Sequence, residues 1–215
     1  MSRAVPRNAV PGRDVAAGLA FLAGGVALAA GVARERTRAP VQRLDDRWYA
    51  LVERTRTEPR RRASRVLDVG FGTTIDWAAR VAVTALLVRR RRWGALAGWA
   101  GTVVLGELCI GPVKSAIGRP RPPDPLCRTS EQSYPSGHAI ASACTAEGAV
   151  LALMPPGEAR ERALLGAVAL AALTSVSRSD LNAHWLSDCV GGFCLGTGFA
   201  LTVPAVVDAV ADRHN

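Results

Sequence analysis

Long uncharged stretches dominate the distribution of apolar and polar residues along this chain of 215 residues. Residues 15–33 and 189–207 are each nineteen residues without a charge, and residues 93–113 carry one charge, Glu107, in twenty-one positions. A helix needs roughly 20 apolar residues to cross the hydrocarbon core of a bilayer. The pattern therefore predicts an integral membrane protein with several spans.

Three further stretches are weaker candidates for spans. Residues 66–88 carry charges, but Asp76 and Arg80 lie one helical turn apart and can pair, which lowers the cost of placing them in lipid. The stretch over about 138–154 ends at Pro155-Pro156-Gly157, and the stretch over about 163–177 is short but uncharged. None alternates with period two, as the strands of a membrane barrel would, so helices are expected throughout.

The predicted fold is an all-α integral membrane bundle of six transmembrane helices in one domain, residues 1–215. The expected spans lie at about 15–33, 66–88, 93–113, 138–154, 163–177 and 186–207. The first exceeds the roughly 7–15 apolar residues of a signal peptide, so a retained membrane anchor is expected. Spaced small residues, Gly192-x3-Gly196 and Gly106-x4-Gly111, indicate close helix packing.

Residues 34–65 form a polar connection with eleven arginines and five acidic residues. Within it, the sequence Trp48-Tyr49-x-Leu51-Val52 is typical of a helix that lies on a membrane surface. The surrounding charges suit a solvated connector equally well. Both interpretations stay open from the sequence alone.

The chain carries a net charge of +9, and 26 of its 27 basic residues are arginine. Because the arginines fall mainly between the predicted spans, they are expected to meet anionic lipid headgroups of the bilayer and a substrate phosphate. No zinc-finger spacing or interleaving of aromatic and basic residues is present, so nucleic acid is not an expected partner. Four of the five cysteines lie in apolar runs, so no disulfide framework is implied, and the oligomeric state is left undefined.

Three short motifs lie at the ends of predicted spans. They are Lys114-x6-Arg121-Pro122, Pro135-Ser136-Gly137-His138 and Ser177-Arg178-x5-His184-x3-Asp188. The first two lie between spans three and four, and the last lies between spans five and six. Because consecutive spans alternate in direction, these positions share one face of the membrane. The sequence therefore predicts an active site at one membrane face.

Two histidines and a carboxylate in these motifs suit nucleophilic and acid–base chemistry. His184 and Asp188 lie one helical turn apart, so the carboxylate can hold one imidazole nitrogen and leave the other free to attack. His138 comes from a different span on the same face and suits the role of proton donor.

The cations of the motifs describe an anion site. Lys114, Arg121 and Arg178 can hold phosphate oxygens, the arginines through their planar pairs of donors. Ser136 and Gly137 open a helix whose backbone N–H groups attract anions. The histidines and the carboxylate are also possible ligands of zinc or iron, but three nearby cations would repel a dication. We therefore expect neither a metal nor a cofactor.

In order and internal spacing, the three motifs resemble the signature motifs of the type 2 phosphatidic acid phosphatase superfamily. The six-span plan is similar to its membrane branch, which includes bacterial undecaprenyl-diphosphatase-like enzymes. The resemblance implies a metal-independent phosphatase that works through a phosphohistidine, with His184 as nucleophile, Asp188 as its orienting partner and His138 as general acid. It also implies a set of residues that bind the phosphoryl oxygens: Lys114, Arg121, Arg178, Ser136 and Gly137.

Two features near the motifs complicate the match. Asp180 is close enough in the sequence to Arg178 to pair with it and compete with a phosphate. Arg119-Pro120 precedes Arg121-Pro122, and the six-residue gap from Lys114 assigns the phosphate to Arg121 and leaves Arg119 as a supporting cation.

Glu107 is a charged residue within a predicted span, which makes it a functional candidate by default. It lies about two helical turns before Lys114, so we interpret it as a counter-ion to a site cation. Pairing with Arg80 across helices is the alternative.

Bacterial members of the family imply a plasma-membrane protein with its site facing outward and both termini inside. The charge bias does not decide the orientation, since the inside regions would hold ten basic residues and the outside regions sixteen.

The expected substrate is a lipid phosphate or diphosphate whose tail stays in the bilayer. We prefer a polyprenyl diphosphate over phosphatidic acid or phosphatidylglycerol phosphate, because only twelve residues separate Pro122 from Pro135 and leave little structure for reading a headgroup. A diphosphate also presents more charge to the nearby cations: Lys114, Arg119, Arg121, Arg128 and Arg178. Two alternatives stay open, a non-catalytic lipid-phosphate binding or transport protein and a phosphotransferase that uses an alcohol as acceptor.

Overall fold

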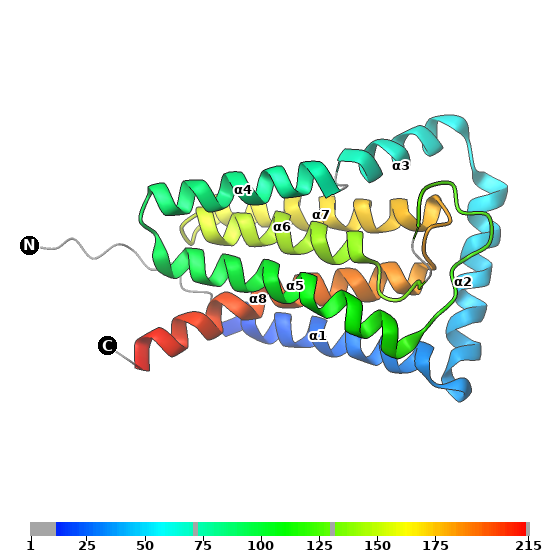
Figure 1. The fold of residues 1–215 in the computed structure, drawn as a ribbon, viewed down its shortest axis with the longest axis horizontal. Coiled ribbons are helices and arrows are strands. Elements are labelled where there is room, and N and C mark those ends of the chain that lie inside the picture. The colour runs from blue at the N-terminus through cyan, green and yellow to red at the C-terminus, as the bar shows by residue number, and fades with distance from the viewer. Residues whose placement is uncertain (1–11, 71–72, 130–131, 214–215) are drawn as a thin grey trace, which may run out of the picture.

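The computed structural model describes residues 12–70, 73–129 and 132–213, and these residues form eight helices and no strand. The helices are α1 (Gly12–Ala33), α2 (Glu35–Thr55), α3 (Glu58–Gly70), α4 (Thr73–Arg89), α5 (Trp93–Ile117), α6 (Gly137–Leu153), α7 (Glu158–Asp180) and α8 (Leu186–Arg213). α1 and α4 to α8 run side by side, whereas α2 lies across one end of the bundle (Figure 1). The predicted all-α fold is confirmed for the described residues.

Three helices have by themselves the length and the apolar composition of a membrane span. They are α1 over Asp14–Ala33, α5 over Trp93–Ile117 and α8 over Leu186–Ala211. α3 and α4 together would form a fourth span, and α6 is apolar but shorter, at 17 residues. The protein is thus an integral membrane protein, and the count of six spans stays a prediction.

The helix expected over residues 66–88 is divided. α3 ends at Gly70, α4 begins at Thr73, and the pair is bent by 42°. α3 leaves the direction of α4 because its polar side chains bind the end of α7. Arg60 pairs with Asp180 at 2.5 Å, and Ser64 Oγ donates a hydrogen bond to the same carboxylate at 2.7 Å. The stretch expected to span the membrane over 66–88 thus falls on two bent helices, and a span at this position stays a prediction.

α8 lies at the centre of the bundle and packs against α1, α5 and α6. A Cβ on Gly192 would lie 2.6 Å from the carbonyl oxygen of Ser136, the N-cap of α6, and one on Gly196 would lie 2.7 Å from the carbonyl oxygen of Ile140 in α6. A Cβ on Gly106 of α5 would meet an α6 side chain at 2.7 Å, but one on Gly111 would have nothing within 4 Å. Close packing is confirmed for three of these glycines and wrong for Gly111. It brings the start of α8 directly against the start of α6.

Residues 34–65 are helical over most of their length, which both interpretations of this segment allow. α2 packs against α1 and the ends of α7 and α8, and Trp48 Nε1 donates a hydrogen bond to Ser179 Oγ at 3.0 Å. Leu44 and Leu51 of the same helix are exposed. α2 therefore has the amphipathic character expected of a surface helix, and its inner side covers one end of the bundle.

The three motifs lie at the end of the bundle that α2 covers. α5 ends at Gly118, whose φ of 58° suits glycine and whose N–H donates to Lys114 O at 2.8 Å. Prolines follow at once and prevent the helix from continuing. α6 begins after Ser136, whose Oγ accepts a hydrogen bond from Ala139 N. The start of α1 and the end of α8 lie at the opposite end (Figure 1).

Candidate active site

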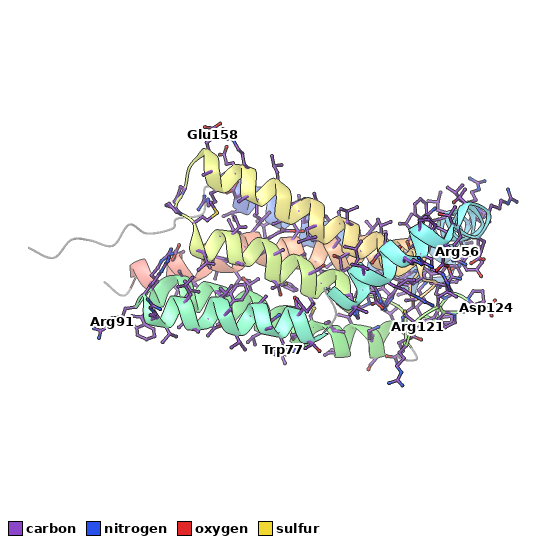
Figure 2. The ribbon with its side chains drawn as sticks, turned by 90° about the horizontal axis from the view of Figure 1, so that it is seen from above. Arg56, Trp77, Arg91, Arg121, Asp124 and Glu158 are labelled. Atoms are coloured by element: carbon purple, nitrogen blue, oxygen red, sulfur yellow. The ribbon has the colours of Figure 1, made fainter. Side chains whose placement is uncertain are left out.

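The residues of the motifs meet where two connections touch, the loop 119–136 and the turn 181–185. Figure 2 shows Arg121 at this end of the molecule. Ser136 N donates a hydrogen bond to Asp188 O at 3.1 Å, which joins the start of α6 to the start of α8. The geometry of the site therefore depends on these two connections.

The turn between α7 and α8 is fixed by residues of α2. Asn182 has a φ of 54°, a conformation that asparagine tolerates better than most residues. Its Nδ2 donates to Glu53 Oε1 at 2.8 Å, and its Oδ1 accepts from Arg56 Nη2 at 2.8 Å. Both partners belong to α2 or to the residue that ends it. His184 lies in this turn, so α2 helps to place it.

His184 is buried, with 4% of its surface exposed. Arg121 Nη1 lies 3.1 Å from His184 Nε2. Because a guanidinium only donates hydrogen bonds, Nε2 must be the acceptor and the imidazole proton must be on Nδ1. The unprotonated nitrogen therefore faces the cation, and its lone pair becomes available for attack on phosphorus when Arg121 releases this contact.

Asp188 faces the other side of the same imidazole. Asp188 Oδ2 lies 3.9 Å from His184 Nδ1, too far for a direct hydrogen bond but close enough for electrostatic attraction. The hydrogen bond expected from the spacing is therefore not formed in this conformation. Nδ1 has no hydrogen-bond partner within the described ranges.

The protonation state of His184 follows from its surroundings. Burial is the main cause that lowers the pKa of His184 to about 4; the Asp188 carboxylate opposes this shift, and the Arg121 and Lys114 cations add to it. The imidazole is therefore neutral at pH 7. A neutral imidazole keeps the lone pair that an attack on phosphorus requires.

The Asp188 carboxylate is fully buried and bound on both oxygens. Oδ1 is 2.5 Å from Arg119 Nη1, and Oδ2 accepts hydrogen bonds from Trp185 N at 2.9 Å and from Ser133 Oγ. These contacts come from the loop 119–136 and from the turn itself. They fix the carboxylate in one orientation beside His184.

The two Arg-Pro pairs have different partners. Arg121 contacts His184 Nε2 and also donates to Ala183 O, whereas Arg119 is buried and binds Asp188. Arg119 further donates to Gln42 Oε1 at 2.8 Å. Arg121 thus lies beside His184 and Arg119 beside Asp188, and the expected binding of a phosphate by Arg121 stays a prediction.

Asp68 of α3 is a site residue that the sequence did not reveal. It accepts a hydrogen bond from Arg178 Nη1, and its Oδ1 lies 3.6 Å from His138 Nε2. The expected competitor of Arg178, Asp180, instead binds Arg60 and Ser64 of α3. Competition for Arg178 therefore comes from a residue more than a hundred positions away in the sequence.

Lys114, Ser136 and Gly137 hold the start of α6. Lys114 Nζ donates to Gln132 O at 2.7 Å, in the loop that precedes the helix. Ser136 is fully buried and serves as the N-cap of α6, and Gly137 is the first helical residue. The backbone N–H groups of this first turn are those that the sequence analysis expects to attract an anion, and that role stays a prediction.

His138 borders a cavity of about 180 Å³ between α4, α5 and α6. Asp76, Trp77 and Glu107 contribute to its lining, and 32% of the His138 side chain is exposed. The cavity thus combines a possible proton donor with two carboxylates and an apolar wall.

Glu107 pairs with Arg80, whose Nη1 lies 2.6 Å from Glu107 Oε1. The same guanidinium binds Asp76 at 2.7 Å, as the spacing of the two residues predicted. The interpretation of Glu107 as a counter-ion to a site cation was therefore wrong, and the alternative pairing across helices is confirmed. Within the residues that the structure describes, no group of three His, Cys, Asp or Glu side chains is arranged to hold a metal ion.

Comparisons with known proteins fit this geometry. The family model of the PAP2 superfamily matches residues 95–211, more than half of the chain. Among solved structures, the crystal structure of the first transmembrane PAP2-type phosphatidylglycerolphosphate phosphatase from Bacillus subtilis is similar in fold. Its TM-score is 0.74 and its sequence identity 22%, over 92% of this chain and 97% of that chain. No curated protein matches the sequence.

Proposed function

The chain belongs to the PAP2 superfamily, and from this premise we propose that it is a lipid phosphatase that works through a phosphohistidine at His184. The observation that carries the proposal is the state of His184. Its imidazole is buried and neutral at pH 7, and its unprotonated Nε2 lies 3.1 Å from the Arg121 guanidinium. A nucleophile needs the lone pair of Nε2, so a bound phosphoryl group must draw the Arg121 guanidinium from Nε2 onto its own oxygens, where the cation stabilises the developing charge.

In the first step, His184 Nε2 forms a bond to phosphorus while the bond from phosphorus to the lipid oxygen breaks. His138 gives a proton to that oxygen, so the lipid leaves without a new negative charge. Arg121, Lys114 and Arg178 hold the three other phosphoryl oxygens, with the backbone N–H groups at the start of α6. The positive charge gained by the imidazole lies beside Asp188, which stabilises it.

In the second step, a water molecule attacks phosphorus and the bond to His184 breaks. His138, neutral after the first step, accepts a proton from this water. Inorganic phosphate leaves, and both histidines return to their starting states. The scheme uses no metal ion and no cofactor.

Asp68 contacts two groups with different roles in this scheme: Arg178, which holds the phosphoryl oxygens, and His138, which protonates the leaving oxygen. Without substrate it occupies part of the Arg178 donor set, so a phosphate must share or replace this contact. Its Oδ1 lies 3.6 Å from His138 Nε2, where the carboxylate attracts the positive charge that the imidazole carries in its proton-donating form. The pairing therefore costs some phosphate affinity and supports proton transfer.

The substrate class within lipid phosphates is the finer part of the proposal. A polyprenyl diphosphate was preferred because several cations surround the motifs. Two of them have carboxylate partners, Arg119 with Asp188 and Arg178 with Asp68, so less positive charge is left for a second phosphate. A panel of polyprenyl diphosphate, phosphatidic acid and phosphatidylglycerol phosphate in matched detergent tests the preference. A tenfold or greater preference for phosphatidic acid would overturn it.

The proposed location is a bacterial plasma membrane with the site facing outward. Asp124 lies near Arg121 at the site end of the molecule (Figure 2). An Asp124→Cys variant should react with a membrane-impermeant maleimide in intact cells, in a background without the native cysteines. Labelling only after the membrane is permeabilised would reverse the orientation.

The activity itself is tested by phosphate release from lipid phosphates in the presence of EDTA. We expect full activity, since the chemistry rests on protein side chains alone. Loss of turnover on chelation would contradict the metal-free scheme. The carrier alternative predicts tight substrate binding without phosphate release. Product analysis with added alcohols tests the transferase, which would form new phosphate esters in place of free phosphate.

A further inference from the structure

One carboxylate of the segment over residues 34–65, that of Asp45, is buried inside the site. Asp45 of α2 is 1% exposed, although most of the polar residues around it face solvent. Its Oδ1 accepts a hydrogen bond from Ser187 N at 2.9 Å, and its Oδ2 accepts one from Ser187 Oγ at 2.6 Å. Ser187 immediately precedes Asp188, so α2 binds the backbone next to the residue that orients His184.

Asp45 also binds the cation that holds Asp188. Arg119 Nη2 lies 2.7 Å from Asp45 Oδ2, and Arg119 Nη1 lies 2.5 Å from Asp188 Oδ1. The two nitrogens belong to one rigid planar group, so a carboxylate on one of them limits where the other can lie. Arg119 is 2% exposed, which removes water as an alternative partner. The position of Asp188 is thereby coupled to Asp45 through a buried guanidinium.

A role confined to attaching α2 would not require this arrangement. An attachment needs only the two hydrogen bonds to Ser187, which a neutral side chain can also make. The carboxylate of Asp45 instead helps to neutralise the buried Arg119 guanidinium, which Asp188 would otherwise have to neutralise alone. One guanidinium between two carboxylates leaves one net negative charge behind His184, where the imidazole becomes positive during the reaction.

We propose that Asp45 is a positioning residue for the phosphatase reaction, acting through Arg119 on Asp188 and so on the orientation and charge stabilisation of His184. The inference rests on the proposed function, because it assigns a role in forming the phosphohistidine. It also gives the polar segment a function: α2 completes the support of the nucleophile from outside the three motifs.

The test compares Asp45→Asn with Glu58→Gln in the full-length protein in detergent. Glu58 is an exposed carboxylate of the neighbouring helix α3 and pairs with Arg61 and Arg62 of that helix, so it controls for the loss of a negative charge from the segment 34–65. In a single turnover with labelled phosphatidic acid, Asp45→Asn should form phosphohistidine about 10- to 100-fold more slowly, as expected for a misplaced catalytic group. KM should stay within about threefold, and Glu58→Gln should match the wild type.

A second substrate separates this role from an effect on the proton donor. Misplacing the nucleophile should slow lipid phosphates and 4-nitrophenyl phosphate by the same factor, since both need His184. A loss confined to the lipid substrate would place the effect on His138 and overturn the proposal. Wild-type phosphohistidine formation by folded Asp45→Asn would also overturn it.

Arg119→Lys provides a variant that leaves the Asp45–Ser187 bonds in place. Lysine keeps the charge but cannot bridge two carboxylates in one plane. We expect a similar loss of rate, and a double variant that is no slower than the slower single one, because both changes break one connection. Fully additive losses would contradict the coupling. If the wild type itself forms no phosphohistidine, the proposed function fails rather than this inference alone.

Discussion

The two histidines of the site have opposite surroundings. His184 is 4% exposed and lies in a turn held by α2, with Arg121 on one side and Asp188 on the other. The His138 side chain is 32% exposed and borders the cavity between α4, α5 and α6. A nucleophile gains from being fixed and neutral, whereas a proton donor must meet leaving groups of different shape and exchange protons with water. The asymmetry therefore supports the proposal that His184 attacks and that His138 transfers the proton.

The supports of the two histidines differ in the same way. Asp188 is bound on both oxygens by residues of two connections and is backed by the Arg119–Asp45 pair. Asp68 comes from the separate helix α3 and divides its contacts between Arg178 and His138. One carboxylate is thus a fixed part of the core, and the other belongs to a polar helix at the bundle end.

Removing the nucleophile should have the largest effect. His184→Ala should lower kcat/KM for every phosphate substrate by about 10⁴-fold or more, because no other group can form the covalent intermediate. Phosphate release per folded molecule, with thermal stability measured in parallel, checks this. An enzyme of near wild-type activity would refute the assignment of His184.

Removing the proton donor should have a large effect that depends on the leaving group. His138→Ala should lower kcat/KM for a lipid phosphate by about 10²- to 10⁴-fold, the range of general acid catalysis. The loss should be far smaller for 4-nitrophenyl phosphate, whose leaving group departs without a proton. Equal losses on both substrates would mean that His138 does not act as the acid.

Changing Asp68, which contacts His138, should have a smaller effect, with separate changes in kcat and in KM. Asp68→Asn removes a carboxylate from both His138 and Arg178, so kcat for a lipid phosphate should fall about 10-fold while KM also falls. Glu58→Gln, an exposed position on the same helix, is the matched control. A rise in KM would contradict the view that Asp68 competes with phosphate for Arg178.

The motif residues could be recognised from the sequence because their spacing within each motif is local. His184 and Asp188 are one turn apart, and alternating spans bring the motifs to one end whatever the details of packing. Asp45, Asp68 and Ser133 could not be found in this way, since each meets its partner across dozens of residues and carries no local signal. Asp68 was further concealed by a span expected over residues 66–88, which in fact divides between α3 and α4.

The helices, like the residues of the site, could be predicted from the sequence only in part. Apolar runs of adequate length identified α1, α5 and α8, whereas the interaction of α3 with Asp180 of α7 depends on tertiary contacts. For Glu107, the sequence allowed two partners, and only the packing of α4 against α5 selects Arg80. Local patterns therefore predicted most of the helices and yielded the proposed catalytic set, and the supporting contacts required the fold.

Acidification should have the smallest effect over the neutral range. Because the pKa of His184 is lowered to about 4 in the folded protein, the nucleophile stays unprotonated well below the usual histidine value of about 6.5. After correction for the ionisation of the substrate, kcat/KM for 4-nitrophenyl phosphate should stay level from pH 7 to pH 5. The unfolded chain binds the proton first, so His184 should also lower the stability of the fold as pH falls from about 6.5 to 4. An activity loss centred near pH 6.5 would contradict a buried neutral His184.

The most direct test of the central claim is the position of the phosphoryl group in the trapped intermediate. Enzyme mixed with labelled lipid phosphate in EDTA and denatured under conditions that preserve phosphohistidine should carry the label on His184. The bond should be to Nε2, because Nδ1 holds the proton and faces Asp188. A label on His138, a bond to Nδ1, or turnover with no covalent intermediate would contradict the account.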